Sequence, residues 1–302
     1  MKILVTGALG FIGSNLTERL VAEGHEVSAL DNLHTGSEQN IEKIKDKVKV
    51  FVLDAGFIEK TGEKFDAIMH NGVYSSSPMY KKNPHLTAKA IDEWISVLEY
   101  ARKNDSKVVF ASTSSMYNGI EPPHKEDAIP HITDFYTEAR IMMERLAKLY
   151  NDFYSMPIVG LRYFSVYGPH EKAKKGYANL VTQFLWKMKA GERPVLFGDG
   201  TQTRDFTYVD DVVEANLLAL NYKKLGNFNI GTGKSTTLNE VVQMLNSKLA
   251  TSLEPVYEPN KIKNYVMHTQ ADTSKAEKEL HFKAKISLDE GMDKLIKCYS
   301  QV

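Results

Sequence analysis

The sequence predicts an α/β protein built on a doubly wound parallel sheet, with a smaller mixed α/β lobe in its C-terminal part. Two observations predict this class. Short apolar runs alternate with helix-like segments over about the first 165 residues, which is typical of parallel strands buried on both faces. A glycine-rich turn also joins the first apolar run to the first helix-like segment. The 302 residues are enough for one large domain or for two lobes with a sizeable core.

The chain begins with a strand, a glycine-rich turn and a helix. Ile3–Val5 predicts a buried strand, and Gly7, Gly10 and Gly13 follow it with the spacing G-x-x-G-x-x-G. Gly7 permits the tight turn, Gly10 lets a pyrophosphate approach the backbone, and Gly13 lets the next helix pack close to the sheet. That helix, expected from about Phe11 to Glu23, directs its unpaired N–H groups and its positive dipole end toward the phosphates.

An acidic residue closes the second strand. Glu26–Leu30 ends in Asp31, roughly 18–20 residues beyond the glycines, where a carboxylate can accept hydrogen bonds from the adenosine ribose. A carboxylate there repels a 2′-phosphate, so NAD is favoured over NADP. The alternative interpretation is a glycine-rich turn followed by a turn aspartate. The order of strand, glycines, helix, strand and acid favours a dinucleotide site of the Rossmann type.

Further elements continue the alternation. The remaining strands of the sheet are expected at Val48–Leu53, Ala67–His70, Val108–Ser112 and Pro157–Arg162, with helices at about Leu86–Lys103 and Phe135–Asn151. Because such sheets bind ligands beyond the carboxyl ends of their strands, the polar residues Asp54, Asn71, Ser112 and Thr113 are candidates for the site.

The C-terminal part no longer shows the regular alternation of strands and helices. Glu171–Gly176 is charged and predicts a surface loop, and two capping-box patterns predict the starts of two helices. These patterns are Thr237–Glu240 and Ser287–Glu290, and the other expected elements are a helix at about Tyr177–Ala190 and strands at Val195–Phe197 and Phe228–Ile230.

Composition excludes several classes of partner. The 38 basic and 38 acidic residues give no electrostatic case for nucleic acid or an anionic membrane. The single cysteine, Cys298, excludes an internal disulfide and fits a reducing cytoplasm. No apolar run approaches the ~18 residues of a membrane helix, and the nine histidines show no metal-ligand spacing. We therefore expect a cytoplasmic protein without a metal.

Two segments could carry chemistry. Val109–Tyr117 places hydroxyl groups at the end of a strand, and Tyr136 and Arg140 share one face at the start of a helix. A tyrosine has a pKa near ~10 in water, and a neighbouring cation, together with a nicotinamide ring, favours its phenolate form. Thr113 can donate a hydrogen bond to the same substrate oxygen. A tyrosine base beside a nicotinamide implies alcohol oxidation, whereas each residue taken alone is better explained by packing or capping.

Several motifs in one order resemble the extended short-chain dehydrogenase/reductase family, and its nucleotide-sugar epimerases in particular. They are Thr6–Gly13, Ala111–Tyr117, Tyr136-x-x-x-Arg140, Arg162–Pro169, Arg204–Asp211 and Asn229–Gly233. UDP-glucose 4-epimerase and ADP-glycero-manno-heptose 6-epimerase are the two most similar members, and His70–Ser76 and His268–Asp272 are more similar to the second. The resemblance implies an NAD that is reduced and reoxidised within one turnover while a keto-sugar forms.

The resemblance also implies roles for individual residues. Tyr136 would be the base and Thr113 its hydroxyl partner, Asp54 would contact adenine, Arg204 would grip the diphosphate, and Asn179 would lie near the nucleotide base or its ribose. The implied catalytic residues are Tyr136, Thr113, Arg140 and Lys175. The cofactor contacts are Gly7, Gly10, Phe11, Ile12, Gly13, Asp31, Asn32, Asp54, Asn71, Tyr136 and Arg140, and the substrate contacts are Ser165, Asn179 and Arg204.

Some positions depart from the family pattern. Arg140 stands where the family has lysine, Ala90 and Ser165 where it has asparagine, and Ile262 where it has arginine. Lys175 matches a second acid/base lysine of the heptose epimerases, although a charged loop is more often merely solvated. The Asp-Glu pair that follows the threonine in sugar dehydratases is replaced by Ser114-Ser115, which argues against dehydration.

We hypothesise an NAD-dependent nucleotide-sugar epimerase, acting on a UDP-hexose at C4. The rivals are another epimerase such as one for ADP-heptose, a protein that binds NAD or a nucleotide-sugar with little or no catalysis, and a net reductase. An NAD-binding domain is expected in residues 1–165, with later returns near 204–232, and a nucleotide-sugar-binding lobe in residues 166–302. The resemblance implies a homodimer in which the helices at about Leu86–Lys103 and Phe135–Asn151 pair across a two-fold axis.

Overall fold

A seven-stranded sheet forms the centre of the computed structural model, which describes residues 1–130, 132 and 134–300. The strand order is β11-β6-β5-β4-β1-β2-β3, and all neighbouring strands run parallel. The chain therefore starts in the middle of the sheet, winds to one edge and then to the other. The predicted doubly wound parallel sheet is confirmed.

The strands lie close to their predicted bounds. Ala67–His70 and Val195–Phe197 are reproduced residue for residue, and the other predicted strands differ by one or two residues at one or both ends. The bounds are β1 (Lys2–Thr6), β2 (Glu26–Asp31), β3 (Val48–Val52), β4 (Ala67–His70), β5 (Lys107–Thr113), β6 (Ile158–Tyr163) and β11 (Gly226–Ile230).

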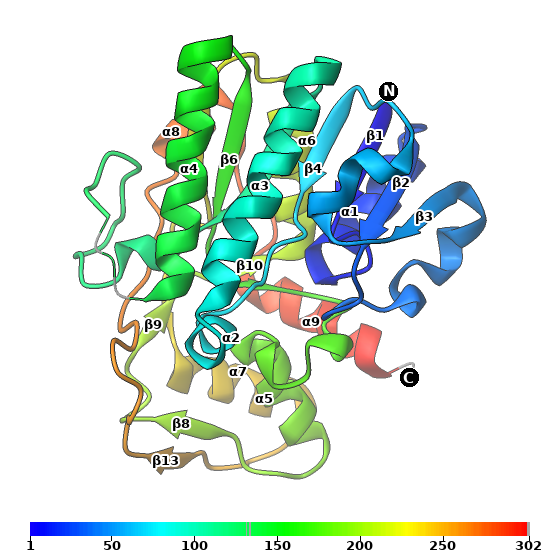
Figure 1. Cartoon of the computed structure of the whole chain (residues 1–302). Helices are drawn as coiled ribbons and strands as arrows, with labels where there is room; N and C mark the ends of the chain where they lie inside the picture. The colour runs from blue at the N-terminus through cyan, green and yellow to red at the C-terminus, as the bar shows by residue number, and fades with distance from the viewer. Residues whose placement is uncertain (131, 133, 301–302) are drawn as a thin grey trace.

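Helices cover both faces of the sheet (Figure 1). The helices α3 (His85–Asn104) and α4 (Phe135–Tyr154) pack on one face, and α1 (Phe11–Ala22) and α6 (Val209–Asn221) pack on the other. Strand β1 shows why both faces are buried, because Leu4 joins the apolar cluster below α3 and α4, whereas its neighbours in sequence join the cluster below α1 and α6.

Three of the described helices were not predicted, and one of them is α8 (Ser274–Glu279). Helix α6 follows directly on the short strand β10 (Thr207–Tyr208), and no side chain caps it, so the acidic Asp210 and Asp211 in its first turn are the sequence signal for its start. Helix α2 (Ser77–Lys82) is a short segment with Pro78 in its first turn. The four 3₁₀ segments are η1 (Glu38–Lys47), η2 (Ala55–Thr61), η3 (Ser114–Tyr117) and η4 (Lys172–Tyr177).

The C-terminal part adds helices and three short strand pairs. Both predicted capping boxes are confirmed, because Thr237 and Glu240 bond each other reciprocally at the start of α7, and Ser287 and Glu290 do so at the start of α9. The elements are α5 (Leu180–Lys189), α7 (Leu238–Leu249), α8 (Ser274–Glu279) and α9 (Leu288–Ser300), with β7 (Val166–Tyr167) paired to β10, β8 (Val195–Phe197) to β13 (Val256–Glu258), and β9 (Thr203–Arg204) to β12 (Thr236–Thr237).

The prediction of a surface loop at Glu171–Gly176 is right for the exposed Lys172, Lys175 and Gly176 but wrong for Glu171 and for the backbone conformation. This segment leads into η4, and Glu171 is fully buried. Its carboxylate accepts hydrogen bonds from the backbone N–H of Asn179 at 2.6 Å and from the Thr182 hydroxyl at 2.6 Å. These donors allow the charge to be buried, and a charged stretch of sequence does not reveal them. The predicted helix at Tyr177–Ala190 begins at Leu180, because Asn179 caps it.

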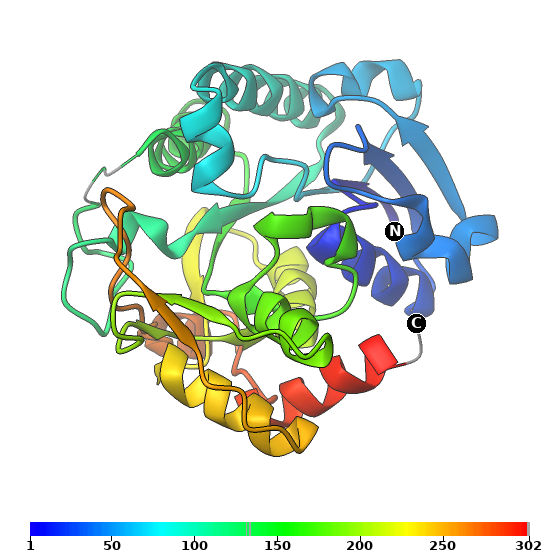
Figure 2. The ribbon, with the colours of Figure 1, turned by 90° about the horizontal axis from the view of Figure 1, so that it is seen from below.

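Segment 259–268 runs from the C-terminal part toward α2 and α4 (Figure 2, orange). Lys81 of α2 donates a hydrogen bond to the carbonyl of Lys263 at 3.3 Å, and the Asn118 side chain donates to the carbonyl of Asn264 at 3.0 Å. This segment therefore links the C-terminal part of the chain to α2 and to Asn118, which border the site described below.

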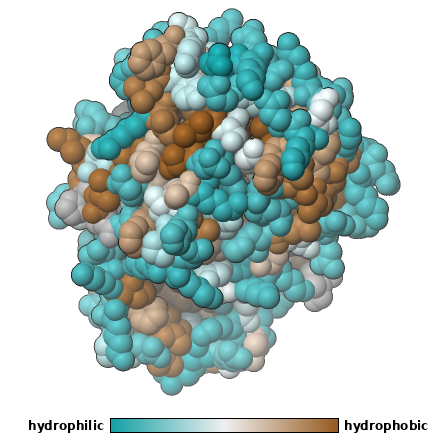
Figure 3. Space-filling view, viewed as in Figure 1, coloured by the Kyte–Doolittle hydropathy of each residue, from teal (hydrophilic) through white to brown (hydrophobic). Residues whose placement is uncertain are grey.

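The outer surface of α3 and α4 carries an apolar patch (Figure 3). Its exposed side chains include Ile95, Leu149 and Phe153. The pairing of two chains through these helices stays a prediction. None of the helices that the structure describes combines the length and the apolar character needed to cross a membrane.

Candidate functional site

A cavity of about 530 Å³ opens beyond the carboxyl ends of the central strands. Its walls come from the sheet, from the start of α4 and from the C-terminal part of the chain. The structure brings most of the predicted site residues to this cavity. The ones that line it are Gly7, Gly10, Phe11, Ile12, Gly13, Asp31, Asn32, Asn71, Ser112, Thr113, Tyr136, Arg140, Ser165, Asn179 and Arg204.

The glycine turn places the start of α1 against the cavity. Gly7 has a φ of +67°, and a Cβ on Gly13 would lie only 2.0 Å from the carbonyl oxygen of Gly7. Only glycine therefore fits at both positions, as the sequence predicts. Gly10 is the N-cap residue and no side chain caps the helix. The first-turn N–H groups and the helix dipole thus fit the diphosphate of a dinucleotide.

The acidic residue at the end of β2 is buried at the cavity wall. The Asp31 carboxylate accepts hydrogen bonds from the backbone N–H of Leu9 at 2.9 Å and of Leu33 at 2.7 Å. Burial raises the pKa of Asp31, and these two N–H donors act in the opposite direction. An ionised carboxylate has further acceptor positions for ribose hydroxyls.

The structure does not bring Asp54 to the cavity. Its carboxylate accepts hydrogen bonds from Asn32 at 2.6 Å and from Lys89 at 2.9 Å, while its neighbours Leu53 and Ala55 line the wall. The hydrogen bond from Asn32 lowers the pKa of Asp54. In this geometry Asp54 orients Asn32, which does line the cavity.

Tyr136 and Arg140 meet at the start of α4. The guanidinium carbon of Arg140 lies 5.2 Å from the centre of the Tyr136 ring. Its nitrogens donate to the carbonyls of Ala111 at 2.7 Å and Tyr74 at 3.1 Å, and the residue is only 3% exposed. Among the described residues no carboxylate forms an ion pair with Arg140. A buried cation held only by carbonyls stabilises negative charge in its surroundings.

Hydroxyl groups connect Thr113 to the helix of Tyr136. Thr113 donates to Ser115 Oγ at 3.1 Å, and Ser115 Oγ lies 3.0 Å from the Thr137 hydroxyl. The end of β5 is therefore tied to the first turn of α4, so Thr113 and Tyr136 are held in one polar wall of the cavity.

The loop after Pro169 presents a different lysine from the predicted one. Lys175 is exposed and does not line the cavity, and its φ of +50° turns the chain. Lys174 lines the cavity with a side chain that is 13% exposed. Its ammonium lies 5.1 Å from the Phe11 ring centre and 3.5 Å from the Glu171 carboxylate. The sequence alone does not show which of the two adjacent lysines lines the cavity.

Arg204 is buried below segment 259–268. Its guanidinium donates to the carbonyls of Thr203 at 2.8 Å and Met267 at 3.1 Å and lies 5.4 Å from the Tyr265 ring centre. Burial lowers the pKa of Arg204. Sequence reasoning did not find Tyr74 or Tyr265, which both line the cavity, because a lone tyrosine in a loop carries no distinctive pattern.

The family model described as "NAD dependent epimerase/dehydratase family" matches residues 3–231. The chain belongs to this family. The prediction of NAD as the cofactor is confirmed with it. The glycine turn and Asp31 line the cavity.

Curated relatives of the chain carry more than one activity. A putative UDP-glucose 4-epimerase from Methanocaldococcus jannaschii is 35% identical over 300 residues, which cover 97% of both chains. A UDP-N-acetyl-alpha-D-glucosaminuronate decarboxylase from Bacillus cytotoxicus is 30% identical over 318 residues, which cover 100% of this chain and 98% of the relative. The chain is thus similar to enzymes that act on nucleotide-sugars, with different reactions among them.

Solved structures match the whole fold. The UDP-glucose 4-epimerase of Thermotoga maritima with UDP-glucose matches with a TM-score of 0.93 and 31% identity, covering 100% of this chain and 99% of the other. The Thermus thermophilus UDP-glucose 4-epimerase with NAD matches with a TM-score of 0.88 and 28% identity, covering 99% of each. The ADP-L-glycero-D-manno-heptose-6-epimerase of Helicobacter pylori matches with a TM-score of 0.90 and 26% identity, covering 100% and 96%.

A buried histidine next to the site makes stability depend on pH. His70 ends β4, its Nδ1 lies 2.8 Å from the Thr6 hydroxyl, and its ring stacks on Trp94. Burial, with a smaller contribution from the Arg140 charge, lowers the pKa of His70 to about 3. The unfolded chain binds this proton below about pH 6.5 and the folded chain does not, so acidification favours unfolding.

We predict that His70 alone lowers the free energy of unfolding by about 2 kcal/mol between pH 6.5 and pH 5. Urea unfolding at several pH values measures it. His70→Asn should flatten this part of the pH dependence, while the control His85→Asn, at an exposed position, should leave it unchanged. Equal slopes for wild type and His70→Asn would contradict the assignment.

Proposed function

We propose that the protein is an NAD-dependent nucleotide-sugar epimerase that interconverts UDP-glucose and UDP-galactose at C4. One observation carries the proposal. Tyr136, Thr113 and the glycine turn line the same cavity as Asn179 and Arg204, so a dinucleotide and a second nucleotide ligand can meet there. The similarity to UDP-glucose 4-epimerases over nearly the full chain supports the choice of substrate.

Each residue has a defined part in this proposal. The Tyr136 phenolate takes the proton of the C4 hydroxyl and later returns it, and Thr113 donates a hydrogen bond to the same oxygen. Arg140 places a positive charge 5.2 Å from the centre of the Tyr136 ring. When bound, NAD supplies a reversible hydride acceptor. The N–H groups at the start of α1 would hold its diphosphate.

The charges around the cavity support epimerisation over elimination of water. Among the described residues, the carboxylates that line the cavity are those of Asp31 and Asp134. The Asp31 carboxylate accepts hydrogen bonds from two backbone N–H groups. Asp134 is the N-cap of α4 and accepts a hydrogen bond from the backbone N–H of Thr137 at 2.8 Å. Ser114 and Ser115 follow Thr113, so among the described residues no acid directly follows Thr113 to protonate a leaving hydroxyl.

Lys174 favours a second candidate, a 6-epimerase of an ADP-heptose. Its ammonium reaches the cavity from the loop after Pro169, where it could serve as a second proton donor. The fold similarity to a heptose 6-epimerase is consistent with this alternative. Tyr136 and Thr113 would keep the same parts.

The first experiment is turnover on a panel of UDP-, GDP-, ADP- and dTDP-sugars, followed by NMR without added NADH. We predict interconversion of UDP-glucose and UDP-galactose. Tyr136→Phe should lower kcat about 10²–10⁴-fold and keep nucleotide-sugar binding, because only the proton acceptor is lost. Binding of a nucleotide-sugar without turnover of any panel member would favour the non-catalytic binding protein, and stoichiometric consumption of NADH would favour a reductase.

A matched pair of variants tests the loop lysines. Lys174→Ala should weaken the binding of NAD or of UDP about tenfold, because a cation beside the diphosphate site is lost. Lys175→Ala should leave both affinities unchanged, since that side chain is exposed. Calorimetric titration measures them. Unchanged binding with a large loss of kcat on ADP-heptose would support the second candidate, and no effect of Lys174→Ala on binding or turnover would contradict a part for Lys174 in the site.

A further inference from the structure

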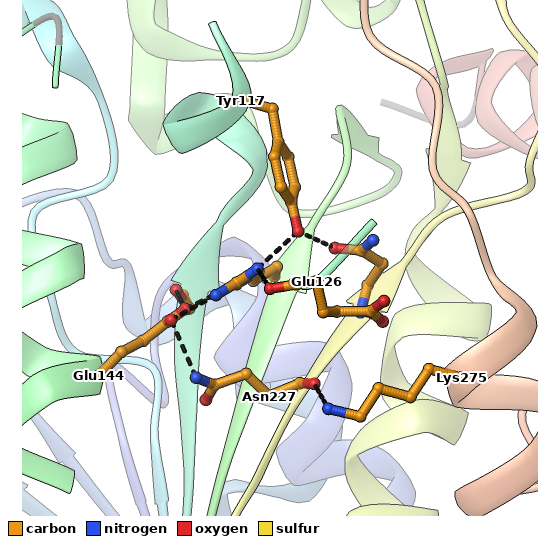
Figure 4. A network of polar contacts seen from close by, with 8 residues as sticks. Tyr117, Glu126, Glu144, Asn227 and Lys275 are labelled. Atoms are coloured by element: carbon orange, nitrogen blue, oxygen red, sulfur yellow. Dashed lines mark hydrogen bonds and ion pairs between the residues drawn. The ribbon is translucent and has the colours of Figure 1, made fainter. Parts of the chain in front are cut away.

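A buried carboxylate collects hydrogen bonds from three strands of the sheet (Figure 4). Glu144 of α4 accepts from Arg162 Nε at 2.9 Å, Arg162 Nη2 at 2.7 Å, the Ser112 hydroxyl at 2.6 Å and the Asn227 amide at 2.9 Å. The two side chains of the ion pair are only 9% and 6% exposed. The donors come from β5, β6 and β11, so one side chain joins α4 to three strands.

The arginine of this pair is itself immobilised. Arg162 Nη1 donates to the Tyr117 hydroxyl at 2.6 Å and to the Glu126 carbonyl at 3.0 Å. Tyr117 donates in turn to the Asn229 side chain at 2.8 Å, and burial raises the pKa of Tyr117 to about 12, which keeps it a donor. Lys275 fixes the backbone of the remaining strand, through the carbonyl of Asn227 at 2.9 Å. The network therefore offers Glu144 a rigid partner.

The place of Glu144 along α4 connects this network to the cavity. Tyr136, Arg140 and Glu144 follow one another at intervals of four residues, so they lie on one face of the helix. On the strand side, Ser112 directly precedes Thr113. The hydrogen bond between Ser112 and Glu144 thus joins the helix that carries the phenol to the strand end that carries its hydroxyl partner.

We propose that Glu144 is a positioning residue, which holds α4 against the end of β5 and thereby sets the separation between the Tyr136 and Thr113 hydroxyls. The proposal rests on the proposed function of these two groups. An ion pair that served stability alone would need only Arg162. The hydroxyl of Ser112 adds a contact at the residue that directly precedes Thr113. A displacement of Ser112 would therefore also displace Thr113. Displacements of the order of 1 Å in such a pair cost about 10²-fold in rate.

Replacing Glu144 itself would leave Arg162 as an unpaired buried cation and endanger folding. Ser112→Ala and Asn227→Ala avoid this, because each removes one neutral donor to the same carboxylate and leaves the ion pair intact. Each variant removes one hydrogen-bond donor to Glu144, but only Ser112 is next to Thr113 in the chain. A purely structural part for Glu144 would make them equivalent.

We expect Ser112→Ala to lower kcat for UDP-glucose epimerisation at least tenfold with KM unchanged, and Asn227→Ala to stay within twofold of wild type. Crystal structures of both variants with NAD should show a longer separation between Tyr136 Oη and Thr113 Oγ1 in Ser112→Ala only. Thermal unfolding should shift by similar amounts in both, so that lost stability cannot explain the difference in kcat.

Two results would overturn the inference: an unchanged hydroxyl separation in Ser112→Ala, or the same kcat in both variants. The structural measurement does not need turnover. If no nucleotide-sugar reacts with the wild type but the separation lengthens in Ser112→Ala alone, the proposed function fails and the positioning by Glu144 stands.

Discussion

The close approach of α1 to the turn after β1 is the constraint on which the site depends. The Cα of Gly13 faces the carbonyl of Gly7 so closely that a single methyl group would collide with it. This contact aims the uncapped start of α1 at the carboxyl edge of the sheet, where β4, β5 and β6 also end. A parallel sheet gathers all these strand ends on one side, so the diphosphate site and the hydroxyl-rich end of β5 face one cavity.

The charges around that cavity are arranged for anionic ligands. Arg140, Lys174 and Arg204 contribute positive charge, while the two lining carboxylates are engaged by backbone N–H groups. Arg140 is held by carbonyls and Arg204 by the segment above it, so their charges are not cancelled by carboxylates in the described part of the chain. Two diphosphates and a phenolate are the kinds of anion that such a surrounding stabilises.

Much of the fold follows from the sequence because strand burial and glycine geometry are local signals. Apolar runs predict the strands of the sheet. Residue spacing predicts the glycine turn and the meeting of Tyr136 with Arg140, and the glycines with Asp31 predict NAD. The predictions failed where the outcome depends on tertiary contacts. Glu171 is buried because the N–H of Asn179 and the Thr182 hydroxyl from the start of α5 reach its carboxylate. Asp54 does not line the cavity, although its neighbours Leu53 and Ala55 do. Lys174 lines the cavity while Lys175 is exposed, and Lys175 has a positive φ, which two adjacent lysines in the sequence do not reveal. The roles assigned to the lining residues remain predictions.

The central claim is that one sugar carbon meets both the phenol of Tyr136 and the bound cofactor inside this cavity. The most direct measurement is the fate of deuterium at C4 of UDP-glucose during turnover in ordinary water, followed by NMR of the product. If hydrogen leaves C4 and returns to it within the closed site, the deuterium stays at C4 of the UDP-galactose that forms. Loss of deuterium to water during the conversion would contradict the account, because the carbon would then exchange with solvent by a different reaction.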